Sequence, residues 1–169
     1  MILAIDPGNT ESGFALIDPI TCRPVEAGKI SNEQLLDHLH QWLVYGPEDY
    51  VTNVAIEMVA SYGMPVGQDI FETCVWAGRF QQVCESFGGY GLPCDLVYRK
   101  NVKLHLCHTT KAKDSNITQA LIDRFASGQP NRGKGTKADP GWFFGFKADI
   151  WQAYALAVLT ADTVSGRVA

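Results

Sequence analysis

The stretch that decides the fold is ILAIDPGNTESGFALID, residues 2–18. Its first apolar run ends in Asp6, the turn Pro7-Gly8 follows, and a second apolar run leads to Asp18. Two short apolar runs on either side of a tight turn predict a buried β-hairpin. Asp6 therefore ends a buried strand, where its carboxylate either closes the turn or is directed at a ligand.

The rest of the chain alternates strands and helices, with turn residues between them. A three-strand antiparallel start followed by βαβ units predicts an α/β fold with a mixed five-stranded sheet and helices on both faces. The length of 169 residues suits one domain, residues 1–169. Further strands are expected at 24–30, 51–58 and 93–98, and helices at 32–45, 68–87, 99–107, 114–125 and 149–162, with Ser31 or Asn32 and Asp114 or Ser115 as caps of the first and fourth helices.

Charge is distributed unevenly along this acidic chain, whose net charge is −4. The segment 99–147 carries ten Lys and Arg residues against three Asp residues, while the remainder has four basic and fifteen acidic residues. Such asymmetry indicates either ordinary solvated charges or one basic face, and we favour a face that contacts phosphates. The candidate DNA-binding residues of this segment are Arg99, Lys100, Lys103, Lys111, Lys113, Arg132 and Lys134.

Three acids stand at positions that the predicted topology brings together. Asp6 ends the first strand, Glu57 ends the fourth, and Asp149 begins the last helix. With no Lys or Arg expected beside them, converging carboxylates repel each other unless divalent cations neutralise them. The sequence therefore predicts a site for Mg²⁺, with Mn²⁺ as a substitute, and two such ions would suit phosphodiester hydrolysis. Taken singly, each acid could instead close a turn, cap a helix or lie exposed at a strand end.

These residues resemble a known family. The segments ILAIDPGNTESGFALID, VAIEM and KADIWQAYALAV are similar to those of the RuvC-type Holliday junction resolvases, which have the ribonuclease H-like fold. Three further segments are most similar in sequence to those of the small bacteriophage members: ASYGMPVGQDIFETCVWAGRFQQ, VKLHLC and DSNITQALIDRF. The resemblance spans nearly the whole chain.

The resemblance implies a homodimer that binds branched double-stranded DNA and makes paired, metal-dependent nicks in four-way junctions. Asp6, Glu57 and Asp149 match catalytic, metal-binding acids of the family. Lys103 matches a DNA-contacting lysine, and Lys111 and Lys113 fall near another, whose own position is Asp114 here. The face of the second helix at Phe71, Val75 and Phe80 is a candidate dimer surface or part of the core.

The chain departs from the family pattern at Gln152, where the family has a second acid in the last helix. An amide oxygen can bind a metal but brings no charge, so Gln152 is a possible auxiliary ligand, and Asp139 either compensates or is a solvated loop residue. Tyr62 is the nearest candidate for the family's aromatic wedge. His105 and His108 are expected on the basic face or in the core, without a general-base role.

Several other functions are weighed against a junction resolvase. An actin-like ATPase also opens with a strand and a turn like DPGNT, but it needs a second such domain. A broader branched-DNA or RNA·DNA hybrid nuclease, and a non-catalytic junction-binding protein, remain open. Free thiols are expected for the five cysteines, and the absence of a signal-like or membrane-spanning segment favours the cytoplasm, that of a bacterial host if the chain is phage-encoded.

Overall fold

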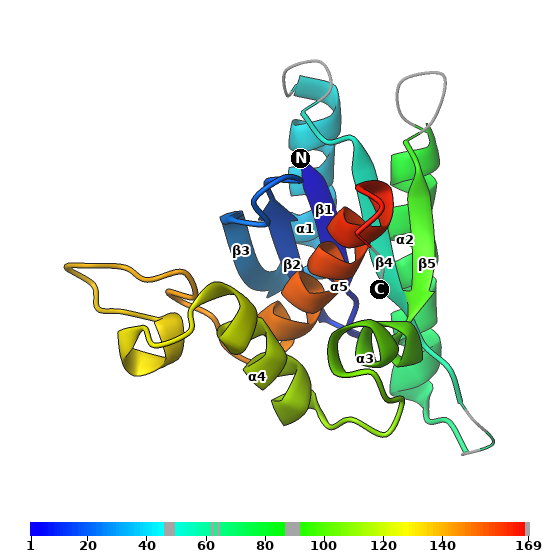
Figure 1. Ribbon diagram of the computed structural model, residues 1–169. Helices are drawn as coiled ribbons and strands as arrows, with labels where there is room; N and C mark the ends of the chain where they lie inside the picture. Colours follow the sequence, from blue (N-terminus) through cyan, green and yellow to red (C-terminus); the bar gives the residue numbers. More distant parts are fainter. Residues whose placement is uncertain (46–49, 62, 64, 87–91, 168–169) are drawn as a thin grey trace.

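The computed structural model describes residues 1–45, 50–61, 63, 65–86 and 92–167. Its centre is a five-stranded sheet with the strand order β3-β2-β1-β4-β5 (Figure 1). β1 pairs antiparallel with β2 and parallel with β4, so the hairpin start and the parallel βαβ continuation are confirmed. The strands are β1 (Ile2–Asp6), β2 (Glu11–Ile17), β3 (Pro24–Ser31), β4 (Asn53–Met58) and β5 (Cys94–Tyr98).

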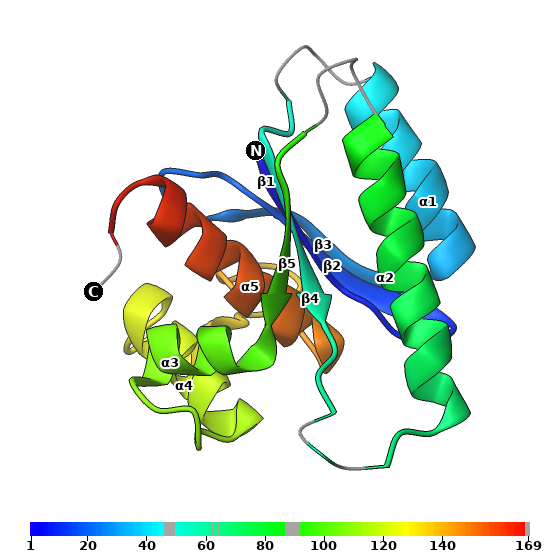
Figure 2. The same ribbon diagram turned by 90° about the vertical axis from the view of Figure 1, so that its right-hand side faces the viewer.

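Helices cover both faces of the sheet, as predicted. α1 and α2 lie on one face, and α3, α4 and α5 lie on the other (Figure 2). None of the described helices combines the length and the apolar character that a membrane span requires. The helices are α1 (Asn32–His40), α2 (Gln68–Ser86), α3 (Arg99–Cys107), α4 (Asp114–Phe125) and α5 (Asp149–Val164), with a π-helical turn at Gln41–Tyr45 and a 3₁₀ turn at Pro130–Gly133.

Side chains of β1 alternate between two hydrophobic clusters, because successive residues of a strand point to opposite faces. Ile2 and Ala4 belong to the cluster under α5, whereas Leu3 and Ile5 belong to the cluster under α1 and α2. All four are fully buried. A central strand that is buried on both faces explains why the opening run is continuously apolar.

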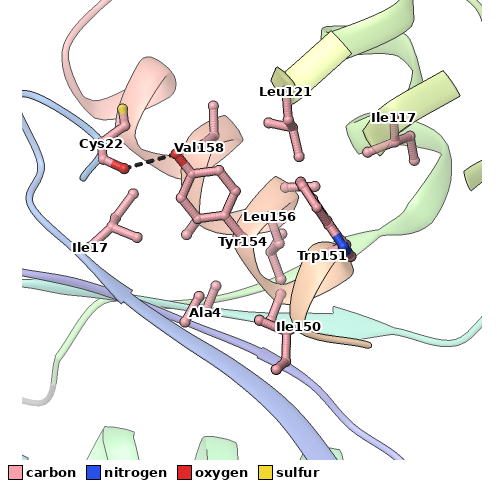
Figure 3. Close-up of a cluster of buried hydrophobic side chains, with 14 of the residues drawn as sticks. Ala4, Ile17, Cys22, Ile117, Leu121, Ile150, Trp151, Tyr154, Leu156 and Val158 are labelled. Carbon is pink, nitrogen blue, oxygen red and sulfur yellow. Dashed lines mark hydrogen bonds between the residues drawn. The ribbon is translucent and has the colours of Figure 1, made fainter. Parts of the chain in front are cut away.

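α5 lies across β1 and β2 and is buried along most of its length. Its small, fully buried residues Ala153 and Ala157 allow close packing on the sheet. The large Tyr154 fills the space between the sheet and the loop after α4, and its hydroxyl donates to the carbonyl of Cys22 at 2.9 Å (Figure 3). The indole of Trp142 donates to the same hydroxyl at 3.0 Å.

Two helix boundaries differ from the prediction. The α-helical part of α1 ends at His40, and a π-helical turn continues the chain to Tyr45. The N-cap of α4 is Lys113, where Asp114 or Ser115 was expected. Asn116 accepts a hydrogen bond from the backbone N–H of Lys113 and so closes this end, while the Asp114 carboxylate contacts Arg99. The predicted cap of α1 is correct, since Ser31 accepts from the N–H of Gln34.

Candidate active site

The strand register places Asp6 and Glu57 side by side at one edge of the sheet. Ile5 of β1 is paired with Ile56 of β4, so the next residues of the two parallel strands are neighbours. Asp6 follows the alternation of Ala4, and both carboxylates therefore point to the face that α5 covers.

The turn after Asp6 is closed by other residues. The hydroxyl of Ser12 accepts from the N–H of Gly8 at 3.2 Å and donates to Asn32 at 2.6 Å. The amide of Asn32 donates back to the carbonyl of Gly8 at 3.0 Å. No hydrogen bond of the Asp6 carboxylate to this turn occurs in the described part of the chain, so Asp6 does not serve as the turn-closing residue.

Asp149 approaches the same edge because Gly13 leaves room for it. Gly13 pairs with Asp6 across the hairpin, and a Cβ atom at Gly13 would lie 2.8 Å from the carbonyl oxygen of Asp149. The residue before, Ala148, has φ 37° and ψ −122°, a conformation that favours glycine. Backbone strain at Ala148 thus accompanies the placement of the first turn of α5.

Ala148→Gly is therefore expected to stabilise the protein by about 1 kcal/mol. Relief of an unfavourable backbone conformation is worth about 1–3 kcal/mol, and the greater freedom of glycine in the unfolded chain offsets part of it. Urea denaturation would measure the change. The matched control is Ala138→Gly, at an exposed position without a positive φ, which should be neutral or destabilising. An equal effect of both substitutions would contradict the assignment of strain.

A pocket of about 410 Å³ opens where these elements meet. Gln152 lines it from α5 with a side chain that is 9% exposed, and its Oε1 has no hydrogen-bond partner among the described residues. A buried amide oxygen without a donor is unfavourable unless a ligand supplies the missing contact. The pocket is lined by Asp6, Glu57, Arg99, Asp114, Ser115, Thr118, Ala148, Asp149, Trp151 and Gln152.

The expectation that no Lys or Arg lies beside the acids is wrong. Arg99 donates from Nη1 to Glu57 Oε2 at 2.7 Å, and its Nη2 lies 3.1 Å from Asp114 Oδ1. Lys29 of β3 places its Nζ 2.8 Å from Asp149 Oδ2. Arg99, a predicted DNA-binding residue, thus contacts two acids of this pocket, and its contact with DNA stays a prediction.

Burial is the main cause that raises the pKa of Asp6 to about 8; the nearby Glu57 also raises this pKa, and Arg99 lowers it by less. Burial also raises the pKa of Glu57, although the ion pair with Arg99 works in the opposite direction. The free pocket therefore holds a carboxyl group that keeps its proton near neutral pH. A bound cation would favour the ionised form of the same group.

The oxygen donors of the pocket fit a hard divalent cation. Carboxylates and an amide oxygen are ligands that Mg²⁺ and Mn²⁺ prefer, and Gln152 Oε1 lacks a partner in the described structure. Within the described ranges, no three His, Cys, Asp or Glu side chains are gathered closely enough to hold an ion together. Three of the four acids that line the pocket, Glu57, Asp114 and Asp149, are instead paired with Arg99 or Lys29.

A second, more basic pocket of about 320 Å³ adjoins the first and shares Arg99 with it. Lys100 and Lys103 of α3 and Thr110 complete its lining. The predicted DNA-binding lysines Lys111 and Lys113 are exposed in the segment between α3 and α4.

The remaining predicted residues lie outside both pockets. Arg132 and Lys134 belong to the loop between α4 and α5, which extends away from the sheet (Figure 1). Asp139 is exposed in this loop and does not line the acidic pocket. His105 contacts the buried Asp162 at 2.8 Å. Tyr62 lies outside the described residues.

The sequence reasoning missed Lys29 and Asp114. Lys29 is paired with Gly13, which is itself paired with Asp6. The register of the three strands β1, β2 and β3 therefore indicates that Lys29 lies near the site. Asp114 was considered only as a helix cap and as the position of a family lysine. Its proximity to Arg99 depends on how α4 packs on α3, which no local pattern specifies.

Comparison with known proteins agrees with this architecture. No protein-family model and no curated protein matches the sequence. Among solved structures, the chain is similar to RuvC from Thermus thermophilus, with a TM-score of 0.59, 13% identity and coverage of 99% of this chain and 97% of that one. It is also similar to T. thermophilus RuvC in complex with Holliday junction substrate, with a TM-score of 0.61, 15% identity and coverage of 99% and 96%. The chain therefore has the ribonuclease H-like fold of the RuvC Holliday junction resolvase structures.

Proposed function

We propose that this chain is a metal-dependent, structure-specific endonuclease that resolves four-way DNA junctions by paired nicks. The observation that carries the proposal is the pocket in which Asp6, Glu57, Asp114 and Asp149 meet at one edge of a RuvC-like sheet. A RuvC neighbour with the same fold was solved with Holliday junction substrate, which supports the choice of DNA substrate. The magnesium requirement rests on the oxygen donors and on the unpartnered Gln152 oxygen.

Asp6 and Asp149 would hold the cation, with Gln152 as a neutral ligand. A bound Mg²⁺ would lower the pKa of a water nucleophile and stabilise charge on the phosphate and leaving oxygens. Asp6 must give up its proton before it can bind the cation, because the carboxylate is the ligand. Glu57 would orient the guanidinium of Arg99, which donates to it, so that this positive charge lies near the negative charge that develops on the leaving oxygen.

Backbone phosphates would be held by the basic residues around the pocket. Lys100 and Lys103 line the adjoining basic pocket, and Lys111 and Lys113 lie exposed beyond it. Contacts of this kind supply affinity without base readout and weaken as salt concentration rises. The exposed Arg132 and the loop that carries it would reach a neighbouring DNA arm, with Lys134 beside it.

The proposed resolvase is a homodimer, since two sites are needed for paired nicks. Phe71 and Val75 are 61% and 60% exposed, one helical turn apart on α2, whereas Phe80 is buried and belongs to the core.

Val75→Asp is expected to weaken dimerisation at least about tenfold, because burial of a valine is worth about 1.5–3 kcal/mol. Sedimentation equilibrium would measure it, with Val164→Asp as the matched control at another exposed valine. Equal dissociation constants for both variants would exclude this face.

The test is cleavage of an immobile four-way junction in Mg²⁺, run beside linear duplex, a fork and an RNA·DNA hybrid. Symmetric paired nicks in the junction alone would support the proposal. Equal cutting of forks or hybrids would favour a broader nuclease, an alternative consistent with the same pocket. Tight junction binding without cleavage in Mg²⁺ or Mn²⁺ would overturn the enzymatic proposal and favour a junction-binding protein, for which the neutral Gln152 is the supporting observation.

A further inference from the structure

Arg99 occupies one side of the acidic pocket. Its guanidinium bridges Glu57 and Asp114, with N···O distances of 2.7 and 3.1 Å. The ion pair with Glu57 is well shielded, since the two side chains are 23% and 15% exposed. Charge-assisted hydrogen bonds of arginine in such surroundings are stronger than those of exposed ion pairs.

The sheet fixes this placement of Arg99. Glu57 of β4 is paired with Val97 of the parallel strand β5, and Val97 packs against the cluster under α5. Arg99 follows two residues later, at the point where β5 ends and α3 begins, so it continues on the same face. The guanidinium therefore reaches Glu57 from the first residue of α3, directly after the neighbouring strand β5.

Two residues of α5 that line the pocket, Asp149 and Gln152, offer oxygen atoms that a cation can take. The Oε1 atom of Gln152 is buried and has no hydrogen-bond partner among the described residues. Asp149 is paired with Lys29, but both side chains are about one-third or more exposed, so water can readily replace this contact. Asp6 also lines the pocket and lies next to Glu57 in the sheet.

The charges around the pocket favour binding of a divalent ion. Four carboxylates line the pocket; Arg99 contacts two of them, and Lys29 is shared between Asp149 and Glu11. When these seven groups are ionised, their net charge is −3, so a divalent cation beside Asp6 and Asp149 is attracted. A second divalent ion beside Glu57 would be repelled by the guanidinium that already contacts this carboxylate.

We propose that Arg99 takes the place of a second metal ion beside Glu57, so that each pocket binds one divalent cation through Asp6, Asp149 and Gln152. The inference rests on the metal requirement of the proposed function and replaces the two ions expected from the sequence. Arg99, held by Glu57 and Asp114, would bring a fixed positive charge close to a substrate phosphate. Its charge would stabilise the developing negative charge without a second ion.

The experiment counts the Mn²⁺ ions bound per chain in the DNA-free protein at pH 8, from the electron paramagnetic resonance signal of free Mn²⁺. The wild type is expected to bind one ion. Arg99→Gln should bind two, because the position beside Glu57 is then open, and Arg99→Lys should bind one, because it keeps the charge. Arg79→Gln, the same substitution at an exposed arginine of α2 on the other face of the sheet, should leave the count at one.

Each possible number of bound Mn²⁺ ions either supports or overturns the inference about Arg99. Two ions of similar affinity in the wild type would overturn the inference, and so would a count that stays at one in a folded Arg99→Gln protein. Thermal unfolding of each variant shows whether it is folded, and Arg99→Lys together with the wild type provides a count that does not depend on the glutamine variant. Junction cleavage by a protein that binds two ions would leave the proposed function intact. A wild type that neither binds Mn²⁺ nor cuts a junction would overturn both.

Discussion

Asp6→Asn is expected to abolish junction cleavage and, at pH 8, to stabilise the metal-free protein. Without its metal ligand, the enzyme would lose several kcal/mol of transition-state stabilisation, which corresponds to a fall in the cleavage rate of roughly a thousandfold. The stabilisation has a separate origin. Burial and Glu57 raise the pKa of Asp6 to about 8, far above its value in an unfolded chain.

The sign follows from proton binding. Between about pH 4 and pH 8 the folded protein keeps the Asp6 proton, whereas the unfolded chain has released it. The free energy of unfolding of the metal-free wild type therefore falls as the pH rises through this window. Asparagine cannot ionise, so Asp6→Asn should avoid a loss of about 3–5 kcal/mol at pH 8.

Urea denaturation in EDTA at pH 5 and pH 8 would measure the effect. Asp139→Asn, which changes an exposed loop carboxylate, serves as the control and should follow the wild type at both pH values. Addition of Mg²⁺ should stabilise the wild type and leave Asp6→Asn unchanged, because ligand binding stabilises only the form that binds. A variant with the same pH dependence as the wild type would contradict this account of Asp6.

Asp162→Asn is expected to destabilise the protein by about 2–4 kcal/mol, which is a large share of the stability of a small domain. The Asp162 side chain is 2% exposed, and its carboxylate accepts two hydrogen bonds from Arg124, at 2.6 and 2.8 Å. His105 contacts the same carboxylate at 2.8 Å, and Arg167 lies 3.5 Å away. Removal of the negative charge leaves these basic groups without their shared partner.

The pH dependence of this network runs opposite to that of Asp6. Burial opposes ionisation of Asp162, but the hydrogen bonds from Arg124 and His105 outweigh it and hold the pKa below its usual range. Its contribution to stability is therefore present above about pH 4 and is lost as the pH falls further.

Thermal and urea unfolding at pH 7 would test the prediction for Asp162. Asp123→Asn on the exposed face of α4 is the matched control and should change stability by less than about 0.5 kcal/mol. A loss of similar size in both variants would contradict a special role of the buried carboxylate.

The sequence was sufficient to predict the sheet because each strand is bounded by an unambiguous turn. The apolar run before Pro7-Gly8 and the apolar run of β4 each end in an acid, and the parallel pairing of these strands places Asp6 beside Glu57. Gly13 then admits the first turn of α5, so the position of Asp149 follows from the same hairpin. Which metal ions bind there stays a prediction.

The partners of these acids could not be predicted in the same way. Charge counts along the chain assigned Arg99 to the basic surface, although its distance from Glu57 depends on the pairing of β4 with β5. The contact of Asp114 with Arg99 depends on the packing of α4 against α3, which involves side chains far apart in the sequence. Long-range contacts of this kind have no local periodicity by which to recognise them.

The hydrogen bonds of Ser12 and Asn32 have a consequence for how the position of Asp6 is fixed. They fasten the turn after Asp6 to the start of α1, which lies in the layer opposite to α5. The strand end that carries Asp6 is thus fixed by contacts from the layer that does not contain α5, independently of how α3, α4 and α5 pack. The position of this carboxylate is therefore set by the sheet and α1, and substitutions in the α3–α5 layer should change its surroundings more than its place.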